Sequence, residues 1–279
     1  LGDETVRRNK EFLPEATNLE ANVGLPDPAL IGLGVLTTVL VVLAFILLPL
    51  LWIINNKEAA LVYATPLIWL GISSAWFHFY LRPEIFSYFF LAILFYFLAT
   101  IRKQALDEKL TFKNSRWFMV AVPFLTLVWA NFHSGFVISI LLQLILVLSE
   151  LLKKLFIPDE KSPFLQISAI SLGASLVATL INPFGFGLWQ YLPHLFFARS
   201  NMLIQELRPL SFSELLGPSF FPFLMLILMV SNFLLFSLVK SEAATRGAFL
   251  KASGLVLLSI IVGIACRRLI PFCALVIVF

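Results

Sequence analysis

Two short polar stretches between apolar runs carry side chains that could do acid–base or anion-binding chemistry. Asn131 and His133 lie in WANFHSGF (129–136), and Arg82 and Glu84 lie in RPE. An imidazole can relay a proton, hydrogen-bond a sugar or phosphate, or ligate a metal near neutral pH. A guanidinium matches phosphate oxygens in a planar fork. These residue types indicate a site for an anionic or hydroxyl-bearing ligand.

Two later stretches carry similar side chains. Glu206 and Arg208 lie in QELRP, and the adjacent Arg267 and Arg268 lie in CRRLIP. An arginine facing lipid would be costly, so arginines near helix ends are expected to point toward protein or water. We expect these residues at the same membrane face as the first two stretches.

Plain structural roles compete with each interpretation. Pro83 and Glu84 suit the first turn of a helix, because a carboxylate there complements the helix dipole. His133 can be a packed histidine with a satisfied hydrogen bond. Arg267 and Arg268 can anchor helix ends among lipid headgroups. The histidines are scattered, at 78, 133 and 194, and show no metal-ligand spacing.

The amino-acid composition indicates which kind of secondary structure holds these residues in place. The chain has 279 residues, is 60% hydrophobic and 13% charged, and has a mean hydropathy of +0.95, which is typical of an integral membrane protein. We predict an all-α, polytopic bundle of about nine transmembrane helices, because several apolar runs reach the roughly 17 to 25 residues that cross a bilayer. The predicted spans are Ala29 to Ile54, Ala59 to Tyr80, Ile85 to Ile101, Trp117 to Ala130, Gly135 to Leu152, Phe164 to Ile181, Ser219 to Val239, Ala252 to Cys266 and Leu269 to Phe279.

Lysine and arginine counts orient these spans. Twelve lie in the loops on one side and eight on the other, three of the eight in the N-terminal segment. The richer side is predicted to be cytoplasmic. The outer loops then contain FYLRPE, WANFHSG, INPFGFGLWQYLPH, QELRPLSF and CRRLIP, so any chemistry is expected on the extracytoplasmic face.

Two local features refine this topology. The span 117–130 has 14 residues, roughly 21 Å of helix against about 30 Å of hydrocarbon, so either Arg116 extends the helix or the turn at 131–135 lies below the surface. The second feature is LWQYLPHLF (188–196), predicted as an amphipathic interfacial helix after an NPFGFG turn.

The chain begins LGDETVRRNK without an initiator Met and ends in an apolar run. We therefore expect an internal piece of a longer protein, truncated at both ends. The predicted organisation is an extracytoplasmic segment 1–28 and a transmembrane domain 29–279 with an outer loop 182–218.

The order RPEIFSYFF, WANFHSGF, LINPFG, an outer LRP and a later RRLIPF resembles a group of bacterial multi-pass proteins. That group is related to polyprenyl-phosphate-sugar glycosyltransferases of the GT-C superfamily, which includes the protein O-mannosyltransferase type. The opening LGDETVRRNKEFLPEATN is similar to the outer segment after the first span of that group, where LGDxIVRTGxxPxxDPF is usual.

The resemblance implies a hexosyltransferase in the bacterial inner membrane that moves a sugar from a polyprenyl-phosphate carrier to a lipid, glycan or protein acceptor. An acidic residue acts as general base in such enzymes, and cationic groups or a divalent metal stabilise the leaving phosphate. The family's acidic motif lies before the LGD segment, so Asp3 and Glu4 are the nearest carboxylates, and the segment 18–28 lacks the usual DPF. Expected partners are the polyprenyl-phosphate-linked sugar and membrane lipids, not nucleic acid.

Two other classes stay open. In a transporter or flippase, the same arginines would line a pathway for an anionic or lipid-linked solute, and charged groups within the spans would favour it. A non-enzymatic membrane subunit would leave the clustering of outer motifs unexplained.

Overall fold

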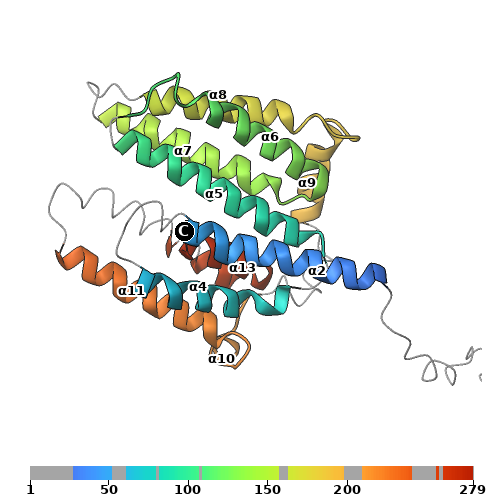
Figure 1. Ribbon diagram of the computed structural model, residues 1–279, viewed down its shortest axis with the longest axis vertical. Coiled ribbons are helices and arrows are strands. Elements are labelled where there is room, and N and C mark those ends of the chain that lie inside the picture. The colour runs from blue at the N-terminus through green and yellow to red at the C-terminus, as the bar shows by residue number, and fades with distance from the viewer. Residues whose placement is uncertain are drawn as a thin grey trace, which may run out of the picture. The chain divides into compact units, whose positions relative to one another are not determined.

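The computed structural model describes residues 28–51, 61–79, 82–106, 109–156, 163–197, 209–240, 256–257 and 260–278 (Figure 1). Across these ranges the regular secondary structure is helical and no strand occurs, so the predicted all-α class is confirmed there. The chain divides into two compact units, Leu1–Leu36 and Thr37–Phe279. The described part of the first unit is the start of helix α2 (Pro28–Val42), and the other described helices belong to the second.

Most of the described helices coincide with the predicted spans, whereas those at Gly187–Phe197 and Phe212–Leu215 lie in the predicted outer loop 182–218. The described helices are α2 (Pro28–Val42), the π-helical η2 (Leu43–Leu47), α4 (Leu61–Ala75), the 3₁₀ helix η3 (Trp76–His78), α5 (Glu84–Leu106), α6 (Arg116–Phe132), α7 (Phe136–Phe156), α8 (Pro163–Ala178), α9 (Gly187–Phe197), α10 (Phe212–Leu215), α11 (Phe221–Lys240), the 3₁₀ helix η6 (Arg267–Leu269) and α13 (Ile270–Val278). The span predicted at 252–266 lies partly outside the described residues, and 260–265 within it is helical.

Two helices in the described ranges are long and apolar enough to cross a membrane, Ile31–Leu51 and Glu84–Ala105. Shorter apolar helices cover Thr65–Ala75, Arg116–Phe132, Phe136–Leu152, Pro163–Ala178 and Phe221–Ser231. Length and composition in the described ranges thus identify two spanning candidates, fewer than the nine expected from the sequence.

The RPE stretch marks the start of α5, as predicted. Glu84 is the first residue of the helix, and its side chain is only 5% exposed. A carboxylate in the first turn stabilises the positive end of the helix dipole, which supports the structural interpretation of Glu84. Arg82, just before the helix, is exposed.

The α6 helix is longer than the run that predicts it. It begins at Arg116 and ends at Phe132, a length of 17 residues, or about 25 Å at 1.5 Å per residue. The structure therefore adopts the first predicted alternative, in which Arg116 extends the helix. Its length stays below the roughly 30 Å of hydrocarbon.

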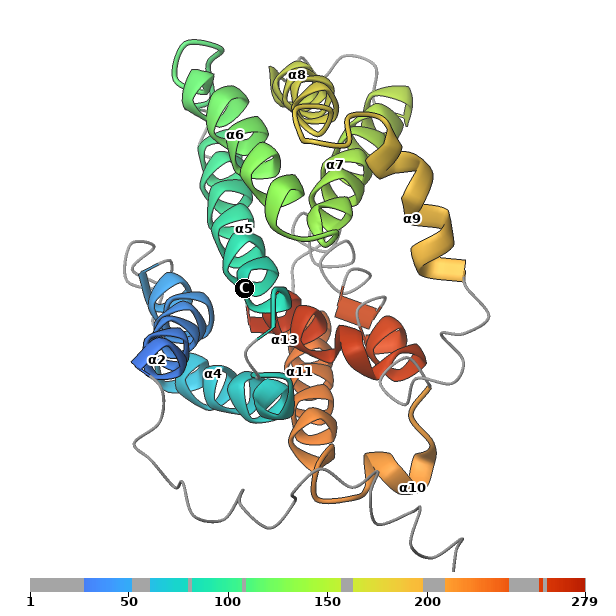
Figure 2. The same cartoon turned by 90° about the vertical axis from the view of Figure 1, so that its right-hand side faces the viewer.

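The second unit contains two groups of packed helices. In one group α5, α6, α7 and α8 lie together, and in the other α4, α11 and α13 lie together (Figures 1 and 2). The α13 helix also packs against α5, where the Tyr88 ring meets Phe272 edge-on at 4.9 Å between centroids. The α8 helix contacts α6 and α7 with small buried side chains such as Ser171 and Ala178, which let helix backbones approach closely.

A buried hydrogen-bond network connects α6, α7 and α8. The Gln143 amide donates to Ser139 Oγ at 3.2 Å, and its oxygen accepts from the Ser171 and Ser175 hydroxyls at 3.0 and 3.1 Å. Ser139 Oγ is also 2.8 Å from Thr126 Oγ1. All five side chains are at most 2% exposed. Ser139 and Gln143 of α7 together connect the three helices, Ser139 to α6 and Gln143 to α8.

Replacing Gln143 with leucine should lower the free energy of unfolding by about 1–2 kcal/mol, because two buried hydroxyls lose their acceptor. Reversible unfolding in mixed detergent micelles measures this. The control is Leu141→Ala on the same helix, where the side chain is 50% exposed and should matter less. A Gln143→Leu variant as stable as the wild type would show that the network does not stabilise the bundle.

Candidate functional site

The WANFHSGF stretch forms the tight turn between α6 and α7. His133 has an extended backbone, with φ −159° and ψ 147°, and directly follows the last residue of α6. The helix resumes as α7 at Phe136. The predicted turn at 131–135 is therefore confined to three residues, 133–135.

Four residues form what we call the His133 cluster: Ser87, Trp129, His133 and Gly135. The Trp129 indole N–H donates to Ser87 Oγ at 2.8 Å, and Ser87 Oγ lies 2.7 Å from His133 Nδ1. The Gly135 backbone N–H also donates to Nδ1, at 3.1 Å. Trp129 and Ser87 are fully buried and His133 is half-buried. The Nδ1 atom of His133 is therefore hydrogen-bonded within the chain, as in the packed-histidine interpretation.

Gly135 has a steric role in this cluster. A Cβ atom at this position would lie 2.5 Å from Ser87 Oγ and 3.0 Å from His133 Nδ1. Both distances are too short for a side chain to be accommodated without movement. The glycine is therefore required because Ser87 approaches the turn so closely.

Asn131 joins α6 to the segment after α8. Its amide donates to the carbonyls of Leu127, at 2.9 Å, and Ile181, at 3.0 Å. Both amide hydrogens bond backbone, so the donor capacity predicted for a ligand is used within the chain.

The NPFGFG stretch forms the predicted turn. The Asn182 side chain accepts from the Phe184 N–H at 2.7 Å, and Gly185 has φ +52°, which favours glycine. The helix predicted at 188–196 is confirmed as α9. Its Trp189 N–H donates to Thr179 Oγ1 at 2.9 Å.

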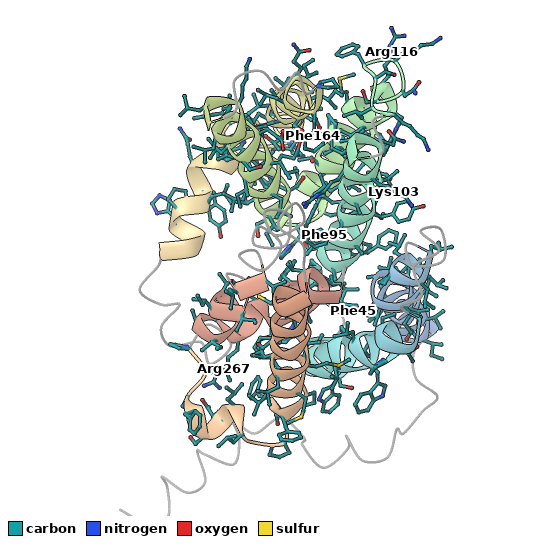
Figure 3. The ribbon with its side chains drawn as sticks, turned by 90° about the vertical axis from the view of Figure 1, so that its left-hand side faces the viewer. Phe45, Phe95, Lys103, Arg116, Phe164 and Arg267 are labelled. Atoms are coloured by element: carbon teal, nitrogen blue, oxygen red, sulfur yellow. The ribbon has the colours of Figure 1, made fainter. Side chains whose placement is uncertain are left out.

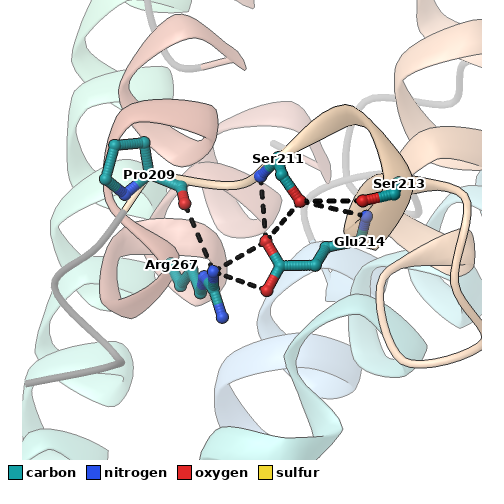
Figure 4. Close-up of polar contacts among 5 residues, drawn as sticks. All are labelled: Pro209, Ser211, Ser213, Glu214 and Arg267. Carbon is teal, nitrogen blue, oxygen red and sulfur yellow. Dashed lines mark hydrogen bonds and ion pairs between the residues drawn. The ribbon is translucent and has the colours of Figure 1, made fainter.

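A second polar group, the Arg267 cluster, consists of Arg267, Glu214, Ser211 and the Pro209 carbonyl (Figure 4). Arg267 Nη2 lies 2.7 Å from both carboxylate oxygens of Glu214 and donates to the Pro209 carbonyl at 3.3 Å. Its guanidinium carbon is 5.8 Å from the Phe220 ring centroid. Among the described residues, the buried Arg267 Nε has no hydrogen-bond partner.

Ser211 and Glu214 form a capping box at the start of α10. Glu214 Oε2 accepts from the Ser211 N–H at 2.9 Å and from its hydroxyl at 2.7 Å, while Ser211 Oγ accepts from the Glu214 N–H. The carboxylate that pairs with Arg267 is therefore oriented by its own helix terminus.

Polar contacts join most of the stretches expected on the outer face. The first turn of α5 contacts the α6–α7 turn, because Ser87 bonds His133. The last turn of α6 contacts the segment after α8 through Asn131. The backbone carbonyl of Arg267 bonds the buried His78 ring at 3.1 Å, and its side chain bonds the segment before α10. Arg267 and Arg116 lie far apart in Figure 3, and Arg116 belongs to the side predicted to be cytoplasmic.

The structure describes only some of the predicted site residues. Asp3, Glu4, Glu206 and Arg208 lie outside the described residues, as does the side chain of Arg268. Sequence reasoning missed Ser87, Trp129 and Glu214. Helical spacing offered a signal for two of them, because Ser87 lies one turn after Glu84 and Trp129 one turn before His133.

The His133 cluster contains a titratable ring whose pKa is shifted by its surroundings. Burial lowers the pKa of His133 below its usual 6.5, so the imidazole is neutral at physiological pH.

Within the described part of the chain, no three His, Cys, Asp or Glu side chains gather where they could hold a metal ion. Comparison with protein-family models, curated proteins and solved structures finds no match.

Substituting Gly135 with alanine should destabilise the protein by about 1–3 kcal/mol, because Ser87 must move away from His133. Thermal unfolding in detergent measures the change. Gly173→Ala on α8 is the matched control, since a Cβ there has no atom within 4 Å. It should be neutral or stabilise by about 0.5–1 kcal/mol through helix propensity. The same effect for both variants would contradict the steric role of Gly135.

The Arg267 cluster should weaken in acid. The pKa of Glu214 is lowered from its usual 4.5, first by the Ser211 backbone N–H, then by the Ser211 hydroxyl, with the Arg267 charge contributing. A lowered folded-state pKa means that the contact stabilises fully above 4.5 and is lost as pH falls through the lowered value. A ¹³C-carboxyl NMR titration should place Glu214 below 4.5, and Ser211→Ala should raise it. A wild-type pKa at or above 4.5 would refute the pairing.

Proposed function

We propose that this protein is a GT-C-like membrane glycosyltransferase. It transfers a sugar from a polyprenyl-phosphate carrier to a hydroxyl of a lipid, glycan or protein acceptor at the extracytoplasmic face. The observation that carries the proposal is the set of contacts among four stretches far apart in sequence, around residues 78–87, 131–135, 181 and 209–214, with η6. These stretches hold the motifs on which the family resemblance rests.

We propose that the described helices belong to a multi-pass bundle in the bacterial inner membrane. Large apolar side chains are exposed on several helices, including Val120 at 69%, Phe124 at 65%, Leu155 at 72% and Val177 at 63%. Exposed apolar surface on this scale indicates contact with lipid or another protein. Together with the two spanning candidates, it supports assignment of the shorter apolar helices to the bundle.

The chemistry demands a base for the acceptor and positive charge for the leaving phosphate. Arg267 and Arg82 are the candidates for the charge among the described residues, with Arg208 and Arg268 as further candidates. The carboxylate of Glu214 pairs with Nη2 of Arg267, and Nε is buried, so a phosphate would bind Nη1 or displace that carboxylate. For the base, Asp3 and Glu4 remain the candidates.

A transporter ranks second. Transport of an anionic solute would be favoured by charged groups within the helices. The polar side chains buried between α6, α7 and α8 are uncharged and hydrogen-bonded to one another, as expected of interhelical packing.

The test is turnover of radiolabelled polyprenyl-phosphate sugars by the purified protein in lipid vesicles. We expect label transfer or release of carrier phosphate, and a fall in kcat/KM of roughly 10²-fold for Arg267→Ala and for Arg82→Ala, because each removes charge stabilisation. The matched control is Arg102→Ala, an exposed arginine near the other end of α5, which should retain wild-type turnover.

Absence of turnover by the wild type, with carrier lipids bound equally by all variants, would reject the transferase. Movement of a lipid-linked sugar across the vesicle membrane would then favour the flippase. Equal losses in all three arginine variants would show a general effect of charge removal instead.

A further inference from the structure

We propose that Ser87 and Gly135 hold His133 as the imidazole protonated on Nε2, so that Nε2–H is a hydrogen-bond donor for a phosphate oxygen of the ligand. The identity of the ligand rests on the proposed function. The tautomer does not, because it follows from the contacts of the His133 cluster.

The Gly135 contact fixes the role of Nδ1. A backbone N–H is always a donor, and this one points at Nδ1 from 3.1 Å. Nδ1 must therefore offer its lone pair. A proton on Nδ1 would oppose the Gly135 hydrogen.

The Trp129 contact fixes the role of the Ser87 hydroxyl. An indole N–H can only donate, and it reaches Ser87 Oγ at 2.8 Å. The serine oxygen accepts this bond, which leaves its own hydrogen to be donated to His133 Nδ1, 2.7 Å away. Because the Gly135 N–H already requires an unprotonated Nδ1, the Ser87 hydroxyl is the donor in its contact with the same nitrogen.

The remaining proton of the neutral ring is on Nε2. Among the described residues, Nε2 has no hydrogen-bond partner, and the His133 side chain is half-buried rather than enclosed. Ser87 is a positioning residue, since it is fully buried and acts through the imidazole. Because the tautomer presents a donor, His133 binds an acceptor oxygen and is not the base for the acceptor hydroxyl.

The first measurement is the tautomer, which needs no activity. The chain has three histidines, so a long-range ¹H–¹⁵N spectrum of protein labelled with ¹⁵N-histidine is simple, and loss of signals in His133→Gln assigns them. At pH 7 we expect an unprotonated Nδ1 and a protonated Nε2. Ser87→Ala should shift the population toward a mixture, whereas Ser168→Ala, a buried serine whose hydroxyl has no partner among the described residues, should not. A proton on Nδ1 in the wild type would overturn the assignment.

The second measurement is ligand binding by the same spectrum. Farnesyl phosphate should shift the His133 Nε2–H signal, and farnesol should leave it unchanged. A similar shift with inorganic phosphate would assign the contact to the phosphate group alone, and a shift only with farnesyl phosphate would assign it to a lipid phosphate. No shift with either phosphate would overturn the ligand half of the proposal, even if turnover of the carrier sugar is observed.

Kinetics then separates donation from packing. His133→Gln retains an N–H donor near the Nε2 position, so kcat/KM should fall less than about 10-fold, whereas His133→Leu should lose roughly 10²-fold. Equal loss in both variants, with the tautomer confirmed by NMR, would show that the donor is not used in the transferase. Absence of wild-type turnover would instead count against the proposed function.

Discussion

The packing of the described helices depends on one constraint, that a polar group buried among apolar helices is most stable when it is hydrogen-bonded within the chain. Ser87 bonds side chains of α6 and of the α6–α7 turn, and Gln143 bonds two serines of α8 and Ser139 of its own helix. In an apolar surrounding, burying an unpaired hydroxyl or amide raises the free energy of the folded state by more than a hydrogen bond lowers it. The helices therefore pack where these side chains meet, and small residues on α8 permit the close approach.

The same constraint organises the face that carries the candidate site. Backbone groups freed where α6 ends are bonded by side chains, and Asn131 uses its amide for backbone carbonyls instead of a ligand. The Arg267 cluster is satisfied similarly, through Glu214 and a backbone carbonyl. Two nitrogens have no hydrogen-bond partner among the described residues, Nε2 of the half-buried His133 and the buried Nε of Arg267.

This arrangement gives preorganised donors of two kinds. In the proposed tautomer His133 is a neutral donor fixed by buried partners, so it would orient an oxygen without changing the charge of the site. The Arg267 donor is charged and shares its guanidinium with a carboxylate, so an anionic ligand competes with Glu214 for it. A transferase that releases a phosphate benefits from fixed donors, because they need no reorganisation as charge develops.

Sequence alone determined the helices and several of their ends. Apolar runs predicted most of the described helices, although not α10 or η6. Local chemistry predicted the α5 start at Glu84, the turn at Asn182 to Gly185 and the α9 helix, since caps and turns depend on neighbouring residues. Tertiary structure alone decided the partners within the site. Ser87 is 46 positions from His133, and Glu214 is 53 from Arg267. Such pairs depend on how helices rotate and pack against one another, which no short motif encodes.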